Sequence, residues 1–131
     1  MRLIKQQGKS CTLASMCMVA DLDYETMLKK YPADQDLHIQ TVLDELHMQG
    51  FLMMTIECMP SFDGIKCIDM NPARRIVYYC GMYRCMLYQV LGPKKRHMYA
   101  CDKGQVVDPR TGNMCSFPHG LQYIFPVIHN G

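Results

Sequence analysis

The sequence contains no tryptophan and no long apolar run, and neither sign of charge dominates it. No stretch approaches the roughly 20 apolar residues that a membrane-spanning helix requires, and the N-terminus carries no apolar run of signal-peptide length. The 14 basic and 12 acidic residues leave a formal net charge of +2. A general nucleic-acid or membrane-surface protein would be more basic. We therefore expect a cytosolic protein with no membrane partner and with nucleic acid disfavoured as a partner.

The residue spacings that mark zinc sites are also missing. Among the eight cysteines no two are separated by two residues, and no two histidines lie three to five residues apart. Disulfides are rare in the cytosol. We expect no metal and no cofactor, and we expect most cysteines, like the 13 methionines, to be buried packing residues.

The chain has enough apolar material for one compact core. It has 131 residues, of which 49% are hydrophobic and 20% are charged. That length suits one domain, and the composition excludes a wholly disordered chain. Because there are no internal repeats or low-complexity tracts, the sequence predicts a single domain over residues 1–131.

The first 50 residues predict three helices. Residues 12–20 are apolar nearly all round, as in a buried helix, with Ser10 as its N-cap and Cys11 at its first position. Asp23 and Asp36 are expected to cap the next two helices, which Pro32 and Gly50 end. Their apolar faces have helical spacing: Tyr24, Met27, Leu28 and Tyr31 in one, and Ile39, Val42, Leu43 and Leu46 in the other.

The rest of the chain predicts strands. Short apolar runs bounded by turn residues span residues 51–58, 76–80, 82–91, 97–101, 105–107 and 123–128, and residues 65–70 form either a strand or a loop. Asp102-Lys103-Gly104 is typical of a hairpin turn. Helices followed by an antiparallel sheet make an α+β fold.

Cys11 is the cysteine best placed for reactivity. The start of a helix carries partial positive charge and unpaired N–H groups, and both favour a thiolate. Gln6 and Gln7 precede it by five and four residues, so either amide could stabilise an oxyanion beside the Cys11 N–H. A thiolate also needs a histidine with an orienting acceptor. The predicted hairpin brings His97 and Asp108 to one end of the sheet, although Asp108 could instead serve only the Asp-Pro turn.

Two stretches resemble papain-like cysteine peptidases, and in particular the small branch that cuts double-glycine bacteriocin leaders. They are QQGKSCTLASMCMVADLDYETM and HMYACDKGQVVDPRTG. The resemblance implies a papain-like fold and a peptide or protein substrate. It also implies that Cys11 is the nucleophile, His97 the general acid and base, Asp108 its orienting residue and Gln6 the oxyanion donor.

Three functions follow as hypotheses. The first is a thiol hydrolase, a cysteine peptidase or isopeptidase, for which acyl transfer or deamidation would use the same residues. The second is a non-catalytic module that binds a peptide or a host protein, because Thr12 stands where the family usually has Gly and Gln6 is one residue too near Cys11. The third, weak nucleic-acid binding through Lys94, Lys95, Arg96, Arg74 and Arg75, is disfavoured by the balanced charge.

Overall fold

The computed structural model describes residues 1–58 and 72–130. In these residues it has an α+β fold of four helices and seven strands. The helices are α1 (Cys11–Ala20), α2 (Tyr24–Lys30), α3 (Ile39–Met48) and α4 (Pro72–Met82). The strands are β1 (Phe51–Met53), β2 (Ile56–Glu57), β3 (Arg84–Gly92), β4 (Lys95–Asp102), β5 (Gln105–Asp108), β6 (Asn113–Cys115) and β7 (Leu121–His129). The predicted fold class is therefore confirmed at the level of α+β.

All described strands belong to one antiparallel sheet in the order β1-β7-β3-β4-β5-β6, and β2 also pairs with β7. The predicted hairpin between β4 and β5 is confirmed, with Asp102 opposite Gln105. Lys103 and Gly104 between them have φ angles of 49° and 93°, as a tight hairpin turn requires.

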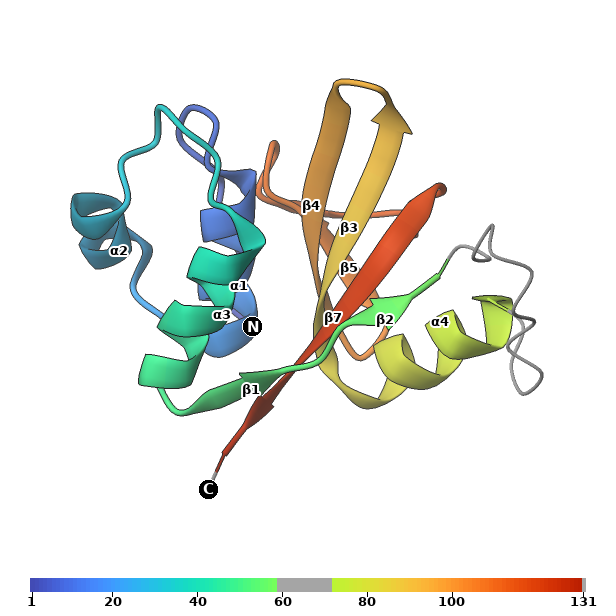
Figure 1. The fold of residues 1–131 in the computed structure, drawn as a ribbon. Coiled ribbons are helices and arrows are strands. Elements are labelled where there is room, and N and C mark those ends of the chain that lie inside the picture. Colours follow the sequence, from blue (N-terminus) through green and yellow to red (C-terminus); the bar gives the residue numbers. More distant parts are fainter. Residues whose placement is uncertain (59–71, 131) are drawn as a thin grey trace.

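Helices cover both faces of the sheet, with α1, α2 and α3 on one side and α4 on the other (Figure 1). The first core cluster joins α1 to Met86, Met98 and Ala100, and the second contains Cys80, Leu87 and Cys101. Successive side chains of a strand point to opposite faces. As a result, Met98 and Ala100 of β4 face α1, whereas Cys101 faces α4.

The prediction of a strand over residues 76–80 is wrong, because this segment belongs to α4. Its valine, isoleucine and tyrosine content suggested a strand, but its burial follows a helical period. Cys80 is buried, and Ile76, Tyr79 and Tyr83 pack against the same core cluster. Val77 is 74% exposed. The spacing from residue 76 to 79, 80 and 83 is that of one helix face.

The strand predicted over residues 51–58 is divided into β1 and β2, although both keep one continuous register on β7. The break lies opposite Pro126. Met54 N–H donates to the Pro126 carbonyl at 2.9 Å, but proline has no N–H to complete the ladder.

Strand β6 has no counterpart in the sequence prediction, and the possible strand over residues 65–70 lies outside the described residues.

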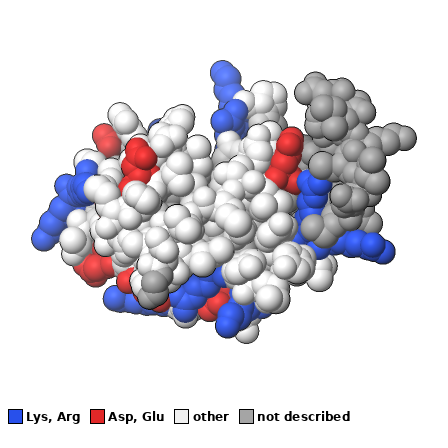
Figure 2. All heavy atoms as spheres, turned by 60° about the horizontal axis from the view of Figure 1, so that its bottom comes forward, with Lys and Arg blue, Asp and Glu red and all other residues white. Residues whose placement is uncertain are grey.

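The charged surface mixes both signs. On the face in Figure 2, lysine and arginine side chains form several separate groups with aspartate and glutamate among them. Lys94, Lys95 and Arg96, at the start of β4, are exposed. No helix in the described part of the chain is long and apolar enough to span a membrane.

Candidate active site

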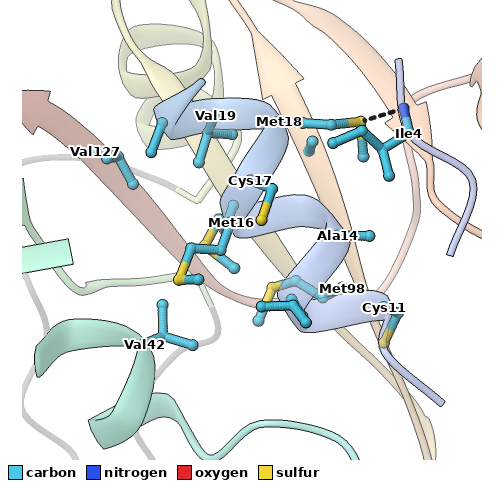
Figure 3. Packing of buried hydrophobic residues seen from close by; sticks show 14 of the residues in the cluster. Ile4, Cys11, Ala14, Met16, Cys17, Met18, Val19, Val42, Met98 and Val127 are labelled. Carbon is cyan, nitrogen blue, oxygen red and sulfur yellow. Dashed lines mark hydrogen bonds between the residues drawn. The ribbon is translucent and has the colours of Figure 1, made fainter. Parts of the chain in front are cut away.

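Cys11 is the first residue of α1, whose ten residues are all buried. Figure 3 shows Cys11 at the N-terminal end of this helix, in the region of Met98. One turn further along α1, the Ser15 hydroxyl donates to the Met98 carbonyl at 3.2 Å. The helix therefore brings the thiol to β4 next to the position of His97.

The N-terminus of α1 is capped from another part of the chain. Ser10 occupies the N-cap position, but its side chain makes no capping hydrogen bond and instead donates to the Gln7 carbonyl at 2.6 Å. Asp36 Oδ1 accepts the Thr12 N–H at 3.3 Å and the Leu37 N–H at 3.1 Å. Asp36 Oδ2 lies 3.7 Å from Cys11 Sγ. The Asp36 carboxylate thus supplies the cap that was expected from Ser10.

The prediction that Asp36 caps the third helix is wrong. Helix α3 begins at Ile39, and its N-cap is His38, whose Nδ1 accepts the Gln40 N–H at 3.2 Å. The residue at the N-cap position stands directly before the first helical residue, and for α3 that position belongs to His38, two residues after Asp36. For α2 the prediction is confirmed, because Asp23 accepts the Thr26 N–H at 3.0 Å.

The surroundings of Cys11 favour its thiol form. Burial and then the negative charge of Asp36 raise the pKa of Cys11, and these effects outweigh the hydrogen bonds from the Met98 backbone and Thr12 that lower it. At neutral pH the side chain is therefore a thiol, and another group must take its proton before it can act as a nucleophile.

His97 and Asp108 meet as the hairpin predicted. His97 Nε2 lies 2.7 Å from Asp108 Oδ1, and His97 is only 3% exposed. Its ring also packs edge-on against Tyr99, with centroids 4.5 Å apart. Burial lowers the pKa of His97 despite the hydrogen bond to Asp108, which raises it. A neutral imidazole that donates Nε2–H to a carboxylate has its lone pair on Nδ1, so Nδ1 is the atom able to accept a proton.

The thiol and the imidazole are close in the fold but not bonded. Within residues 1–58 and 72–130, the hydrogen-bond partners of Cys11 Sγ are Thr12, Asp36 and the Met98 backbone, and none is His97. Strand alternation explains this separation. Met98 faces α1, whereas His97 shares the opposite face with Tyr99. The negative charge of Asp36 nevertheless acts on both groups: it adds to the rise in the pKa of Cys11, and it partly opposes the burial that lowers the pKa of His97.

Neither candidate oxyanion amide is directed at Cys11. Gln6 Nε2 donates to the Gly8 carbonyl at 2.9 Å, and Gln6 Oε1 is buried without a hydrogen-bond partner among the described residues. Gln7 Nε2 donates to Glu25 at 3.3 Å. The Gln6 backbone is nevertheless anchored beside the histidine–aspartate pair, since its N–H donates to the Pro109 carbonyl at 2.7 Å. Gln6 therefore lies nearer to the rest of the candidate site than Gln7 does.

A pocket of about 430 Å³ opens next to the capped helix start. Thr12 and Asp36 form part of its wall, Met98 of β4 lines it as well, and Arg96 contributes a charge. Three aromatic side chains of the sheet complete its apolar lining, namely Tyr88, Tyr123 and Phe125. Pockets of this size and composition can hold a small organic group or an amino-acid side chain.

The other buried cysteines behave as packing residues. Seven cysteines, Cys11 included, lie in the described residues; all seven are free, and among them only Cys115 is exposed. Burial raises the pKa of Cys17 to about 12 and that of Cys58 to about 11. Cys67 lies outside the described residues. In the described part of the chain, no group of histidine, cysteine and acidic side chains is arranged to hold a metal ion.

Asp36 is the site residue that sequence reasoning assigned wrongly. Its position before a helical pattern suggested a local cap, and no short-range signal relates it to Cys11, 25 residues earlier.

The chain was also compared with known proteins. It matches no family model, no curated protein and no solved structure.

Proposed function

We propose that this protein is a small thiol hydrolase, a cysteine peptidase or isopeptidase with a papain-like arrangement. The observation that carries the proposal is the partly buried 2.7 Å contact between His97 and Asp108. His97 belongs to β4, the strand that packs against the helix that begins with Cys11. A neutral imidazole held by a carboxylate is what a thiol nucleophile needs as its base. The cytosol, where thiols stay reduced, is the proposed location.

In the proposed reaction, His97 Nδ1 takes the proton from Cys11 Sγ, and the sulfur forms a bond to the carbonyl carbon of a peptide or isopeptide. The carbonyl π electrons move to oxygen, where the Cys11 N–H and the Gln6 amide stabilise the charge. Collapse of this intermediate breaks the C–N bond, and the leaving amine takes the proton from His97. Water then gives a proton to His97 and attacks the thioester. Release of the carboxylic acid returns that proton to the sulfur.

This reaction requires a rearrangement from the conformation described above. Sγ must leave Asp36, and the His97 ring must turn from the opposite face of β4 so that Nδ1 meets the sulfur. Gln6 Nε2 must exchange the Gly8 carbonyl for the substrate oxygen. Catalytic hydrogen bonds are often long or misaligned before substrate binds. We therefore take the described conformation as a resting state of the proposed enzyme.

The test is turnover of a peptide library, with new termini identified by mass spectrometry. We expect cleavage by the wild-type protein, no cleavage by Cys11→Ala, and a loss of at least about 10²-fold in His97→Gln, as removal of a general base predicts. Cys115→Ala is the matched control, because Cys115 is exposed on β6, and should leave turnover unchanged. Turnover that survives Cys11→Ala would exclude the proposed nucleophile.

A second candidate function is a peptide- or protein-binding module on the same fold. The engagement of Cys11 by Asp36 next to a preformed pocket favours it. This function predicts that a bound peptide or protein is retained by Cys11→Ala and that the wild-type protein cleaves no peptide in the library. Loss of both binding and turnover in that variant would count against it.

A further inference from the structure

The segment between α2 and α3 places a carboxylate on the start of another helix. Asp36 accepts the Thr12 N–H and approaches Cys11 Sγ to 3.7 Å. The backbone of the same segment is tied to the residues before Cys11, because the Ala33 carbonyl accepts the Lys9 N–H at 2.8 Å. Cys11, Thr12 and Asp36 therefore form one local unit, although they come from separate parts of the chain.

We propose that Asp36 is a positioning residue that keeps Cys11 in its thiol form at rest and is displaced from the start of α1 when substrate binds. This inference rests on the proposed hydrolase function. It assigns to that function a substrate-dependent step that precedes attack by the sulfur. The step is a change of hydrogen-bond partners and breaks no covalent bond.

The electrostatics of the helix start explain the role. Unpaired N–H groups and the helix dipole there would stabilise a thiolate, but the Asp36 carboxylate already accepts one of those N–H groups and repels a second negative charge. The other titratable groups around the thiol come from different elements. They are His38 at the start of α3, Arg96 and His97 on β4, and Asp108 behind His97. Asp36 is the one that contacts Sγ in the described residues.

The pocket provides the route for displacement. Asp36 and Thr12 both line it, and Asp36 is exposed. A substrate carbonyl that enters beside Cys11 competes with the carboxylate for the Thr12 N–H. When Asp36 leaves, the thiol loses its acceptor and its negative neighbour together. The sulfur is then free to give its proton to His97.

The experiment measures how the rate of Cys11 alkylation by iodoacetamide depends on pH, with peptide mapping by mass spectrometry. Asp36→Asn keeps an oxygen that can accept the Thr12 N–H but removes the charge. We expect the inflection of its profile to move to lower pH, with labelling at pH 7 faster by roughly tenfold for each unit of that move. Asp34→Asn is the matched control, since Asp34 is exposed in the same segment and makes no contact with Cys11 in the described residues. Its profile should equal that of the wild type.

An unchanged inflection in Asp36→Asn, or one at higher pH, would overturn the inference. Asp36→Ser is measured in parallel, because serine is also a neutral capping residue. If the asparagine variant does not fold, the inflection of the serine variant decides in the same way. Alkylation does not depend on turnover, so the two proposals fail separately. If the wild-type protein cleaves no peptide but Asp36→Asn moves the alkylation profile to lower pH, the hydrolase function is excluded and the effect of Asp36 on Cys11 stands. If the protein cleaves peptides and the profile does not move, only the role of Asp36 is excluded.

Discussion

His97 is a buried base whose protonation must weaken the fold. At the scale of the residue, its imidazole is 3% exposed, bound to Asp108 and packed against Tyr99. Burial lowers its pKa below the ordinary value near 6.5. Between the folded and unfolded pKa values the unfolded chain binds more protons, so the free energy of unfolding rises with pH in that window.

The resulting prediction concerns stability in acid. We expect the free energy of unfolding, measured by urea denaturation, to fall as the pH decreases below about 6.5. Part of this dependence should vanish in His97→Gln, because glutamine can still donate to Asp108 but does not titrate. An identical pH dependence in the two proteins would show that the imidazole is not held in its neutral form by the fold.

Glu45 joins two helices through one buried carboxylate. At the scale of the element, α3 directs Glu45 toward α2, where its Oε1 accepts from Lys30 at 2.7 Å and from Tyr31 at 2.8 Å. Gln49 donates to Oε2 at 3.2 Å. Burial by itself would raise the pKa of Glu45, but these hydrogen bonds hold it below its usual range. The carboxylate is therefore charged at neutral pH although it is only 1% exposed.

Removing this carboxylate should destabilise the helical layer. We expect Glu45→Ala to lower the free energy of unfolding by about 1–3 kcal/mol, because Lys30, Tyr31 and Gln49 lose their shared acceptor and a buried side chain is removed. Asp44→Ala is the matched control on the solvent side of α3, where the exposed Asp44 accepts from Gln40, and it should change stability by no more than about 0.5 kcal/mol. Equal effects in urea denaturation would contradict a structural role for the Glu45 contacts.

The segment before α1 holds the candidate site together. At the scale of the whole molecule, Gln6 N–H donates to the Pro109 carbonyl and Lys9 N–H donates to the Ala33 carbonyl. These bonds tie the residues before Cys11 to the turn after Asp108 and to the segment that carries Asp36. Gly8 lies in the middle of this segment with a φ of 54°, and a Cβ there would lie 2.5 Å from the Ala33 carbonyl oxygen.

Gly8→Ala should therefore strain the backbone and move the residues before Cys11 away from the segment that carries Asp36. We expect a loss of about 1–3 kcal/mol in the free energy of unfolding, from the positive φ and the steric overlap. Gly81→Ala is the matched control, since its Cβ would enter open space near the end of α4, and should be neutral or stabilising by up to about 1 kcal/mol. A Gly8→Ala protein as stable as the wild type would mean that the segment is not held against Ala33 in solution.

Local patterns were sufficient for most elements. Neighbouring residues specify the largely apolar run of α1, the Asp23 cap of α2 and the Lys103-Gly104 turn, and each is present in the structure. The same hairpin made the His97–Asp108 contact predictable. In α4 the residue composition and the spacing of the apolar residues disagreed. The composition suggested a strand, but the residues that pack against the sheet, Ile76, Tyr79 and Cys80, have the spacing of a helix.

By itself, the sequence determined the α+β class, the buried central helix, the position of Cys11 at its start and the pairing of His97 with Asp108. These features depend on residues close together in the chain. Only the tertiary structure decided which group caps that helix, which face of β4 His97 occupies and where the Gln6 amide donates. Those outcomes depend on segments far apart in sequence, such as Asp36 packing onto α1. The physical reason is that an unpaired helix N–H donates to whichever carboxylate the fold brings to it.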